Sequence, residues 1–247
     1  MQKKVFAGTS GLQIDRPKRD FPLAYAQLSR LGYYALHENS IEINSSFYKV
    51  PQQNTLTRWV REVGPDFLFT FKLWSEISHK KNLIFNAADL SRFMKTIHII
   101  PEVNKGCLLV QFPPSLHVNA MSQLRELIES LKSFQWPIAI EFRHSSWYQD
   151  ETYELLNLNQ VAMVIQDMPA SGTPIEVTSD EFVYLRFHGP SGNYKGSYSD
   201  SFLNEYAGYI KKWQEEGKAI YLYFNNTAGA ALENLQSLKK CLADHYK

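Results

Sequence analysis

Eight short apolar runs recur along this chain of 247 residues, and most are followed by a segment whose apolar residues have helical spacing. Runs that are apolar nearly throughout are typical of parallel strands covered on both faces. Apolar residues with helical spacing gather on one face of a helix. Strands are therefore predicted at 5–7, 41–48, 67–72, 107–112, 137–140, 161–167, 182–188 and 219–226, and helices at 21–36, 54–63, 87–100, 120–134, 150–158, 200–216 and 228–245.

This alternation predicts an α/β fold: a single TIM-type (β/α)8 barrel over residues 1–247. One domain is expected because no linker or low-complexity segment divides the chain. The connection 168–181 contains Pro and Gly and leaves no room for a full helix, so the crossover after strand six should be irregular. Asn54 and Asp200 are expected to cap their helices. An open, doubly wound sheet is the alternative fold.

Charge and cysteine usage narrow the class of protein. The net charge of +1 gives no overall field that would steer the chain to nucleic acid or to a membrane. Cys107 and Cys241 lie far apart in the sequence, which is typical of a reduced chain. No apolar stretch approaches the length of about 18 residues that suggests a membrane span, and the first residues lack the apolar run of a signal peptide. We therefore expect a cytoplasmic protein with no membrane partner.

Polar side chains gather where the predicted strands end. In a β/α barrel the site is built from the carboxyl ends of the strands, and alternation along each strand predicts which side chains point inward. Burying many charges together costs several kcal/mol per ion unless they are paired, so a ligand site explains this concentration better than stability does. The inward set is predicted to be Glu42, Asn44, Lys72, Gln111, Glu141, Arg143, Asp167, Tyr184, Arg186, His188, Tyr223 and Asn225, with Gln166 in place of Asp167 if the alternation slips by one residue.

Four of these residues form the predicted catalytic set: Glu141, His188, Glu42 and Asp167. Glu141 and His188 are expected to transfer protons, because burial can raise the pKa of a carboxyl group and histidine changes charge near neutral pH. Glu42 would orient the site or balance its charge. The structural alternatives are an ion pair for either glutamate and a hydrogen-bonded core position for His188.

Anion binding is the second expectation for this site. Arg143 and Arg186 can each hold a phosphate or carboxylate through two parallel hydrogen bonds. The loops after strands seven and eight, which lead past Gly229 into the last helix, are the usual phosphate site of this architecture. His79 and His144 are interpreted as loop residues. The remaining residues of the substrate-binding set are Lys72, Asn44, Gln111, Asn225, Tyr223 and Tyr194.

No cofactor is expected. Neither a dinucleotide-binding glycine motif nor a P-loop occurs. Glu42, Glu141, Asp167 and His188 would suit a divalent metal such as Mg²⁺, Mn²⁺ or Zn²⁺. The neighbouring lysine and arginines compete for the same carboxylates, so the metal is the less favoured hypothesis.

Five further motifs run in order over nearly the whole chain: EINSSFY at 42–48, QFPP at 111–114, EFRHSSW at 141–147, RFHG at 186–189 and YFNN at 223–226. Together they resemble the YecE-like family, a domain of unknown function (DUF72). The resemblance implies a TIM-type barrel and no established reaction.

The residues themselves favour an enzyme that acts on a small phosphate- or carboxylate-bearing molecule by hydrolysis or acid–base chemistry. A nucleic-acid phosphodiesterase of the repair-endonuclease type is an alternative, supported by the basic segments 16–19 and 79–81 and weakened by the near-zero net charge. A non-catalytic protein that binds a metabolite in the same pocket is the other alternative.

Overall fold

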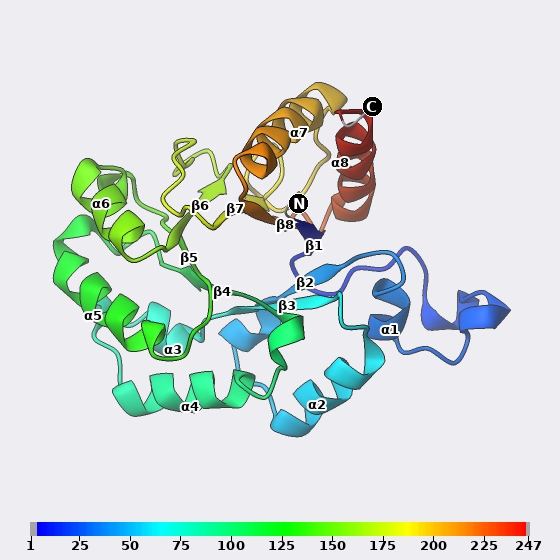
Figure 1. Cartoon of the computed structure of the whole chain (residues 1–247), viewed down its shortest axis with the longest axis horizontal. Coiled ribbons are helices and arrows are strands. Elements are labelled where there is room, and N and C mark those ends of the chain that lie inside the picture. Colours follow the sequence, from blue (N-terminus) through cyan, green and yellow to red (C-terminus); the bar gives the residue numbers. More distant parts are fainter. Residues whose placement is uncertain (1–3, 246–247) are drawn as a thin grey trace.

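Eight parallel strands form a nearly closed barrel, and helices surround it (Figure 1). The structure is a computed structural model that describes residues 4–245, so residues 1–3 and 246–247 of the expected domain lie outside the described residues. The predicted (β/α)8 barrel is confirmed. Its strands are β1 (Val5–Thr9), β2 (Ser40–Ile43), β3 (Leu68–Lys72), β4 (Lys105–Gln111), β5 (Ile138–Glu141), β6 (Ala162–Gln166), β7 (Phe182–Phe187) and β8 (Ala219–Phe224).

Apolar helix faces cover the outside of the sheet. Leucines at helical spacing along α8 pack on β1 and β8, and the aliphatic face of α5 packs near β4 and β5. In the described part of the chain, no helix is both long and apolar enough to cross a membrane. The helices are α1 (Arg30–Tyr34), α2 (Gln53–Glu62), α3 (Ser75–Ser78), α4 (Ala87–Ile97), α5 (Met121–Lys132), α6 (Asp150–Leu158), α7 (Asp200–Glu215) and α8 (Ala231–His245).

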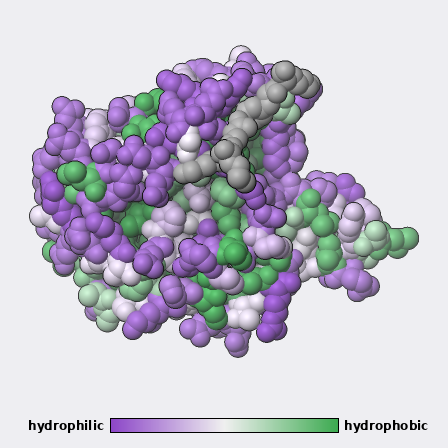
Figure 2. Space-filling model, viewed as in Figure 1, coloured by the Kyte–Doolittle hydropathy of each residue, from purple (hydrophilic) through white to green (hydrophobic). Residues whose placement is uncertain are grey.

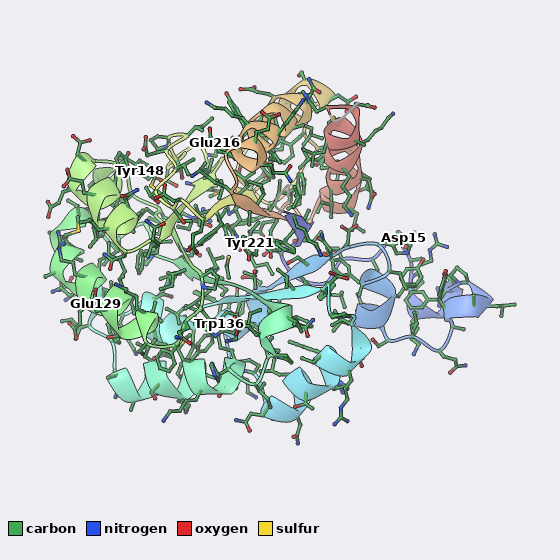
Figure 3. The ribbon with its side chains drawn as sticks, viewed as in Figure 1. Asp15, Glu129, Trp136, Tyr148, Glu216 and Tyr221 are labelled. Carbon is green, nitrogen blue, oxygen red and sulfur yellow. The ribbon has the colours of Figure 1, made fainter. Side chains whose placement is uncertain are left out.

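The barrel interior is filled with aromatic side chains below the strand ends. Tyr221 lies near the middle of the ring in Figure 3 and stacks on Tyr184. Tyr223 is fully buried, and its hydroxyl contacts Ser40 Oγ at 2.6 Å and Thr70 Oγ1 at 2.8 Å. The interior is therefore a packed core, and a ligand can reach only the layer above it.

Side chains complete the barrel between β1 and β2, where the backbone ladder is reduced to one bridge from Ser10 to Glu42. Asn39 accepts from the backbone amide of Ala7 at 2.9 Å and donates to the carbonyl of Val5 at 2.8 Å. The Tyr34 hydroxyl accepts from the amide of Thr9 at 2.8 Å and lies 3.1 Å from the carbonyl of Ser40. These contacts replace ladder bonds that a closed barrel would otherwise make.

Gly8 allows this close approach of the two strands. A Cβ atom at Gly8 would lie 2.0 Å from the carbonyl oxygen of Ser40. Any larger residue would therefore force β1 away from β2 at the seam.

The predicted helix at 21–36 is largely wrong. The chain forms two short 3₁₀ turns at Lys18–Asp20 and Leu23–Tyr25, and α1 begins only at Arg30, where the Ser29 hydroxyl accepts from the amide of Gly32. The segment projects from the barrel (right of Figure 1), its tip is apolar in Figure 2, and Leu23 is 96% exposed. Single aromatic contacts hold the segment to the barrel: Phe21 is buried on the Tyr33 ring, and Tyr25 packs edge-on against the same ring. A helix packed along one apolar face would need a longer surface than this.

The second strand is also shorter than predicted, since it ends at Ile43 rather than residue 48. The Ser46 hydroxyl contacts the carbonyls of Ile43 and Lys72 at 2.6 and 2.7 Å, which turns the chain into a 3₁₀ turn at Asn44–Phe47. Two predicted caps shift as well. Ser199, not Asp200, caps α7 with its side chain, and α2 begins at Gln53 without a side-chain cap from Asn54.

The connection between β6 and β7 consists of turns, with no helix over its described residues. Thr178 holds it to β6: its hydroxyl donates to the carbonyl of Val161 and accepts from the amide of Met163, both at 2.7 Å. Tyr148 donates to the carbonyl of Ser171 at 2.7 Å. These bonds replace the packing that a crossover helix would provide.

Replacing Tyr34 by Phe tests the side-chain seam. The change leaves the buried amide of Thr9 without its partner, so the free energy of unfolding should fall by about 1–3 kcal/mol. Urea unfolding measures this loss. Tyr48→Phe is the matched control, because Tyr48 is 74% exposed and its loss should change stability by less than about 0.5 kcal/mol. Equal stabilities of the two variants would show that the hydroxyl does not hold the seam.

Candidate functional site

A buried network of charges lies directly above the aromatic core, with Arg186 of β7 at its centre. Arg186 Nε lies 3.1 and 2.9 Å from the two carboxylate oxygens of Glu42, and Nη2 lies 2.7 Å from Oε1. Its Nη1 donates to Glu141 Oε2 at 2.9 Å. Arg186 therefore joins carboxylates from opposite sides of the barrel, and it is only 1% exposed.

Glu42 is ionised despite its complete burial. Burial alone would raise the pKa of its carboxyl group, but Arg186 and the hydroxyls of Ser10 and Tyr184 outweigh burial and lower it. Tyr184 donates to Oε2 at 2.6 Å, and Ser10 donates to Oε1. Both carboxylate oxygens of Glu42 are thus bound by groups of the protein itself.

Glu141 is ionised for a similar reason. Burial opposes its charge, but Arg143 and Arg186 hold the pKa of this carboxyl group well below its usual range. Arg143 Nη2 forms an ion pair with Oε1. The geometry of this contact is not that of a hydrogen bond, so Oε1 has no hydrogen-bond donor. A carboxyl group with this pKa carries no proton near neutral pH and is a poor proton donor.

The His188 ring lies between a carboxylate on one edge and two guanidinium groups on the other. Asp167 Oδ1 accepts from the backbone amide of His188 at 2.7 Å and lies 3.3 Å from Nδ1. On the other side, Nε2 lies 2.9 Å from Arg143 Nη2 and 3.1 Å from Arg186 Nη1. Because the carboxylate can only accept and the arginines can only donate, we assign the proton to Nδ1. Burial lowers the pKa of His188, which favours this neutral form.

Arg143 and Lys72 form the upper layer of the site. They are 9% and 7% exposed, whereas the glutamates below them are fully buried. Arg143 Nε is buried without a hydrogen-bond partner. Lys72 Nζ lies 4.2 Å from the centre of the Phe47 ring, and no ion pair to it occurs among residues 4–245. These two cations share the upper layer with Asp167, whose side chain is 13% exposed.

Lys72 has an unusual environment for a lysine. Burial and the nearby Arg186 and Arg143 lower its pKa to about 8, against the opposing influence of the two glutamates. The Phe47 ring favours the ammonium by about 0.5–1 kcal/mol, which retains part of its charge. Lys72 thus holds a mixture of charged and neutral amine close to neutral pH.

Other predicted site residues lie at the same mouth. Gln111 is paired in register with Glu141 on the neighbouring strand, and Tyr194 lies with its ring centre 5.8 Å from that of His188. Asn225 follows β8 and is 6% exposed. Gln166 has the inward phase of Ala162 and Val164 and is paired in register with Arg186, so the alternation in this strand is slipped by one residue from the predicted phase. Asp167 comes directly after the end of β6 and contacts His188.

Asn44 and Tyr223 do not lie where a ligand contact was expected. Asn44 follows the end of β2 and lines a hollow of about 210 Å³ together with outward-facing residues such as Ile41, Ile43 and Trp59. Inward alternation fails there because the strand has already ended. Tyr223 belongs to the barrel core described above, below the charged layer.

The loops after β7 and β8 are hydrogen-bonded to each other through their backbones. The amides of Ala228 and Ala230 donate to the carbonyls of Tyr194 and Gly196, each at 3.1 Å. A Cβ atom at Gly229 would lie 2.5 Å from the nitrogen of Gly196. These two amides, which directly precede α8, are therefore used inside the protein.

Four contributors to the site were missed by sequence reasoning: Ser10, Phe47, His79 and Tyr198. Ser10 and Tyr198 complete the hydrogen bonds of Glu42 and Asp167. His79 packs with its ring centre 4.8 Å from that of Phe47, and burial together with Lys72 and Arg143 lowers its pKa to about 4. Ser10 lies three residues beyond the first predicted strand at 5–7 and directly after β1, and a polar residue just past a strand end is the signal that could have identified it.

A divalent metal finds little support in this arrangement. Among the described residues, no group of three or more His, Cys, Asp or Glu side chains is placed to hold an ion. Glu42 and Glu141 are directed at arginine instead of at a shared point. The carboxylates fit the role of arginine partners better than that of metal ligands.

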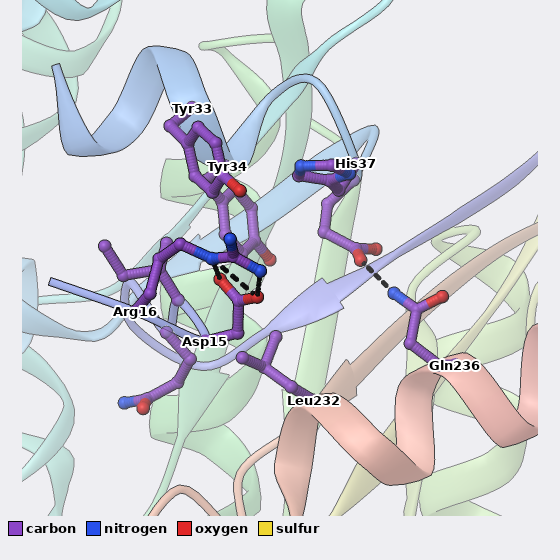
Figure 4. A pocket seen from close by; sticks show the side chains of 10 residues that line it. Asp15, Arg16, Tyr33, Tyr34, His37, Leu232 and Gln236 are labelled. Carbon is purple, nitrogen blue, oxygen red and sulfur yellow. Dashed lines mark hydrogen bonds and ion pairs between the residues drawn. The ribbon is translucent and has the colours of Figure 1, made fainter. Parts of the chain in front are cut away.

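A second hollow, of about 260 Å³, lies outside the barrel beside α1 and α8 (Figure 4). Its charged groups are already paired: Asp15 with Arg16, and Glu38 with Gln236 at 2.8 Å and with Lys239. We favour the barrel mouth as the site, because its cations are not fully paired.

Replacing Glu42 by Gln should lower the free energy of unfolding by about 3–5 kcal/mol, since Arg186 would stay buried without its ionic partner. Urea unfolding at neutral pH measures the loss. Glu129→Gln is the control: Glu129 makes an exposed pair with Lys132 at 3.7 Å, worth less than about 1 kcal/mol. A loss for Glu42→Gln no larger than that of the control would contradict a central role for this pair.

The neutral histidines should make the protein less stable in mild acid. The pKa of His79 falls from 6.5 to about 4 in the folded state. A histidine whose pKa is lowered by folding stabilises the protein above its unfolded pKa, and this contribution is lost as the pH falls toward the folded pKa. His79→Gln should therefore flatten the decline in unfolding free energy between pH 6.5 and about 4.

Unfolding in urea at several pH values measures that decline. His98→Gln, at the exposed end of α4, is the control and should keep the wild-type slope. Equal slopes for the two variants would mean that His79 is not held in its neutral form.

Comparisons with known proteins agree with the fold. The chain is 23% identical to the UPF0759 protein YunF of Bacillus subtilis (strain 168), over 92% of this chain and 91% of that protein. It is 26% identical to the UPF0759 protein YecE of Escherichia coli (strain K12), over 53% of this chain and 47% of that protein.

Two solved structures have the same architecture. A DUF72 family protein from Enterococcus faecalis V583 matches with a TM-score of 0.82 and 22% identity, covering 97% of this chain and 96% of its own. One from Thermotoga maritima MSB8 matches with a TM-score of 0.76 and 27% identity, covering 97% and 99%. The family model described as "Protein of unknown function DUF72" matches residues 6–247, and the chain belongs to that family.

Proposed function

We propose that the barrel mouth binds a small molecule bearing a phosphate or carboxylate group, and that the protein is an enzyme that carries out hydrolysis or acid–base chemistry on it. The observation that carries the proposal is a pair of cations at the barrel mouth that lack a full set of partners. Glu42 and Glu141 are neutralised by Arg186, whereas Lys72 has no ion-pair partner among the described residues and Arg143 Nε has no acceptor. The carboxylate oxygens of Asp167, in the same site, already accept from His188 and Tyr198.

Arg143 is the best candidate for the anion contact. Its Nη2 is used by Glu141 and His188, but its Nε is buried without a partner. A buried donor without an acceptor is unfavourable, and an oxygen of a bound anion would supply that acceptor.

Arg186 takes a different role from the one that its sequence position suggests. Its guanidinium already contacts Glu42, Glu141 and Ser10. We therefore assign it to holding the glutamates and positioning the cations above them, and we do not assign it to the ligand.

In this proposal the proton-transfer role passes from Glu141 and His188 to Lys72. Glu141 is ionised and buried, and both ring nitrogens of His188 are occupied. Lys72 has a pKa of about 8 and is 7% exposed, whereas the two glutamates are fully buried, which suits a group that exchanges protons near neutral pH. His188 and Asp167 then act by orienting Arg143.

Inorganic phosphate tests the anion site. It should raise the melting temperature, because a ligand selective for the folded state stabilises it, by about 2.7 kcal/mol at 100 times Kd. Arg143→Gln should remove most of this shift. Arg125→Gln should keep it, because Arg125 lies on the exposed face of α5 and pairs with Glu151 at 3.3 Å. Differential scanning fluorimetry across phosphate concentrations measures all three proteins at constant ionic strength.

Two outcomes would contradict the proposal. One is a wild-type melting temperature that does not respond to phosphate. The other is an equal response in both arginine variants, which would indicate binding elsewhere on the surface.

A further inference from the structure

We propose that Lys72 is a nucleophilic amine that forms a Schiff base with an aldehyde or ketone carrying a phosphate or carboxylate group. This inference names a substrate class for the anion site proposed above, and it relies on that site to orient the carbonyl compound. It rests on the placement of Lys72, on its missing counter-ion and on its neighbours.

The backbone of Lys72 is fixed at the inner edge of the barrel mouth. Lys72 is the last residue of β3, paired in register with Leu109 of β4, and its carbonyl is bound by the Ser46 hydroxyl at 2.7 Å. Its side chain extends over the Phe47 ring. The amine is thus held at one place, at the end of a strand where catalytic groups of this architecture lie.

The lack of a counter-ion separates Lys72 from the other buried lysine side chains. Lys105 has a side chain that is 7% exposed, and its ammonium pairs with Glu102 at 2.6 Å. Lys218, at 12%, lies 3.9 Å from Asp180. For Lys72 no carboxylate comes within ion-pair distance among residues 4–245, because Arg143 and Arg186 occupy Glu141 and Glu42. A buried lysine that only stabilises the fold would be paired.

The same surroundings increase the fraction of Lys72 that is neutral amine, the form with an available lone pair. With a pKa of about 8, Lys72 has roughly two hundred times more neutral amine at pH 7.5 than a lysine with the ordinary pKa near 10.4. Only the neutral amine attacks a carbonyl carbon, and desolvation beside cationic groups is one way in which proteins activate lysine.

The step is balanced without an oxidant or a metal. Nζ attacks the carbonyl carbon, the carbonyl electrons move to oxygen, and proton transfer gives a carbinolamine. Loss of water then leaves a C=N bond to Nζ. Both protons of the neutral Nζ leave in that water, so the step needs no separate base. His79, neutral against the same Phe47 ring, adds no competing charge beside the amine. Arg143 holds the anionic group of the carbonyl compound.

Glyoxylate with sodium cyanoborohydride tests the proposal on the full chain. Glyoxylate carries an aldehyde and a carboxylate, and the borohydride reduces any imine to a stable secondary amine. Peptide mapping by mass spectrometry should find Lys72 modified at least tenfold faster than exposed Lys4 and buried, paired Lys105. The rate at Lys72 should rise with pH to a plateau above about 8, and inorganic phosphate should slow it.

Lys72→Met keeps the length of the side chain over Phe47 and should lose the fast modification while retaining the fold. Modification of wild-type Lys72 no faster than that of Lys4 would overturn the Schiff-base inference. If phosphate still raised the melting temperature, the anion site would stand without it. A third outcome is fast modification of Lys72 that phosphate does not slow, together with a melting temperature that does not respond to phosphate. That result would support the reactive amine and contradict the anion site.

Discussion

The interaction on which the site depends is the contact of Arg186 with Glu42 and Glu141. All three side chains are buried, and an isolated charge at such a position would cost several kcal/mol. Arg186 offers several donors in a fixed plane, so it can satisfy carboxylates from β2 and β5 at once. Lysine could not take its place, because a single ammonium cannot hold two carboxylates in this geometry.

This contact determines the character of the layer above it. Because Arg186 takes Glu42 and part of Glu141, only one oxygen of Glu141 remains for Arg143, and none remains for Lys72. Three carboxylates and three cations therefore balance overall, counting Glu42, Glu141 and Asp167 against Arg143, Arg186 and Lys72. Their pairing is not balanced, because Lys72 has no carboxylate partner among the described residues and Arg143 Nε has no acceptor.

The sequence alone allows the barrel and most of the charged layer to be predicted. Alternation along a strand is a local rule, so Lys72, Glu141, Arg186 and His188 were assigned to one mouth without any knowledge of tertiary contacts. The rule fails where a strand ends early. Asn44 follows such an end, and the cause is the hydroxyl of Ser46, which bonds to a carbonyl on β3 that is distant in sequence.

The pairing of charges lies beyond local rules. Sequence reasoning treated Arg143 and Arg186 as equivalent anion ligands, but Arg186 lies one layer deeper and is satisfied by Glu42. The contact between the loops after β7 and β8 is likewise non-local, since Gly229 brings its backbone against that of Gly196.

The depth of each layer follows from the packing beneath it. Large aromatic residues, among them Tyr184, Tyr221 and Tyr223, fill the barrel up to the level of Glu42, and the Tyr184 hydroxyl ends directly on that carboxylate. A polar layer on an aromatic floor keeps water from below, which strengthens the ion pairs above it. Lys72 and Arg143 lie above this layer, between the buried ion pairs and the solvent. Neither cation has a full set of partners, which is why the chemistry of the barrel is expected at its rim rather than at its centre.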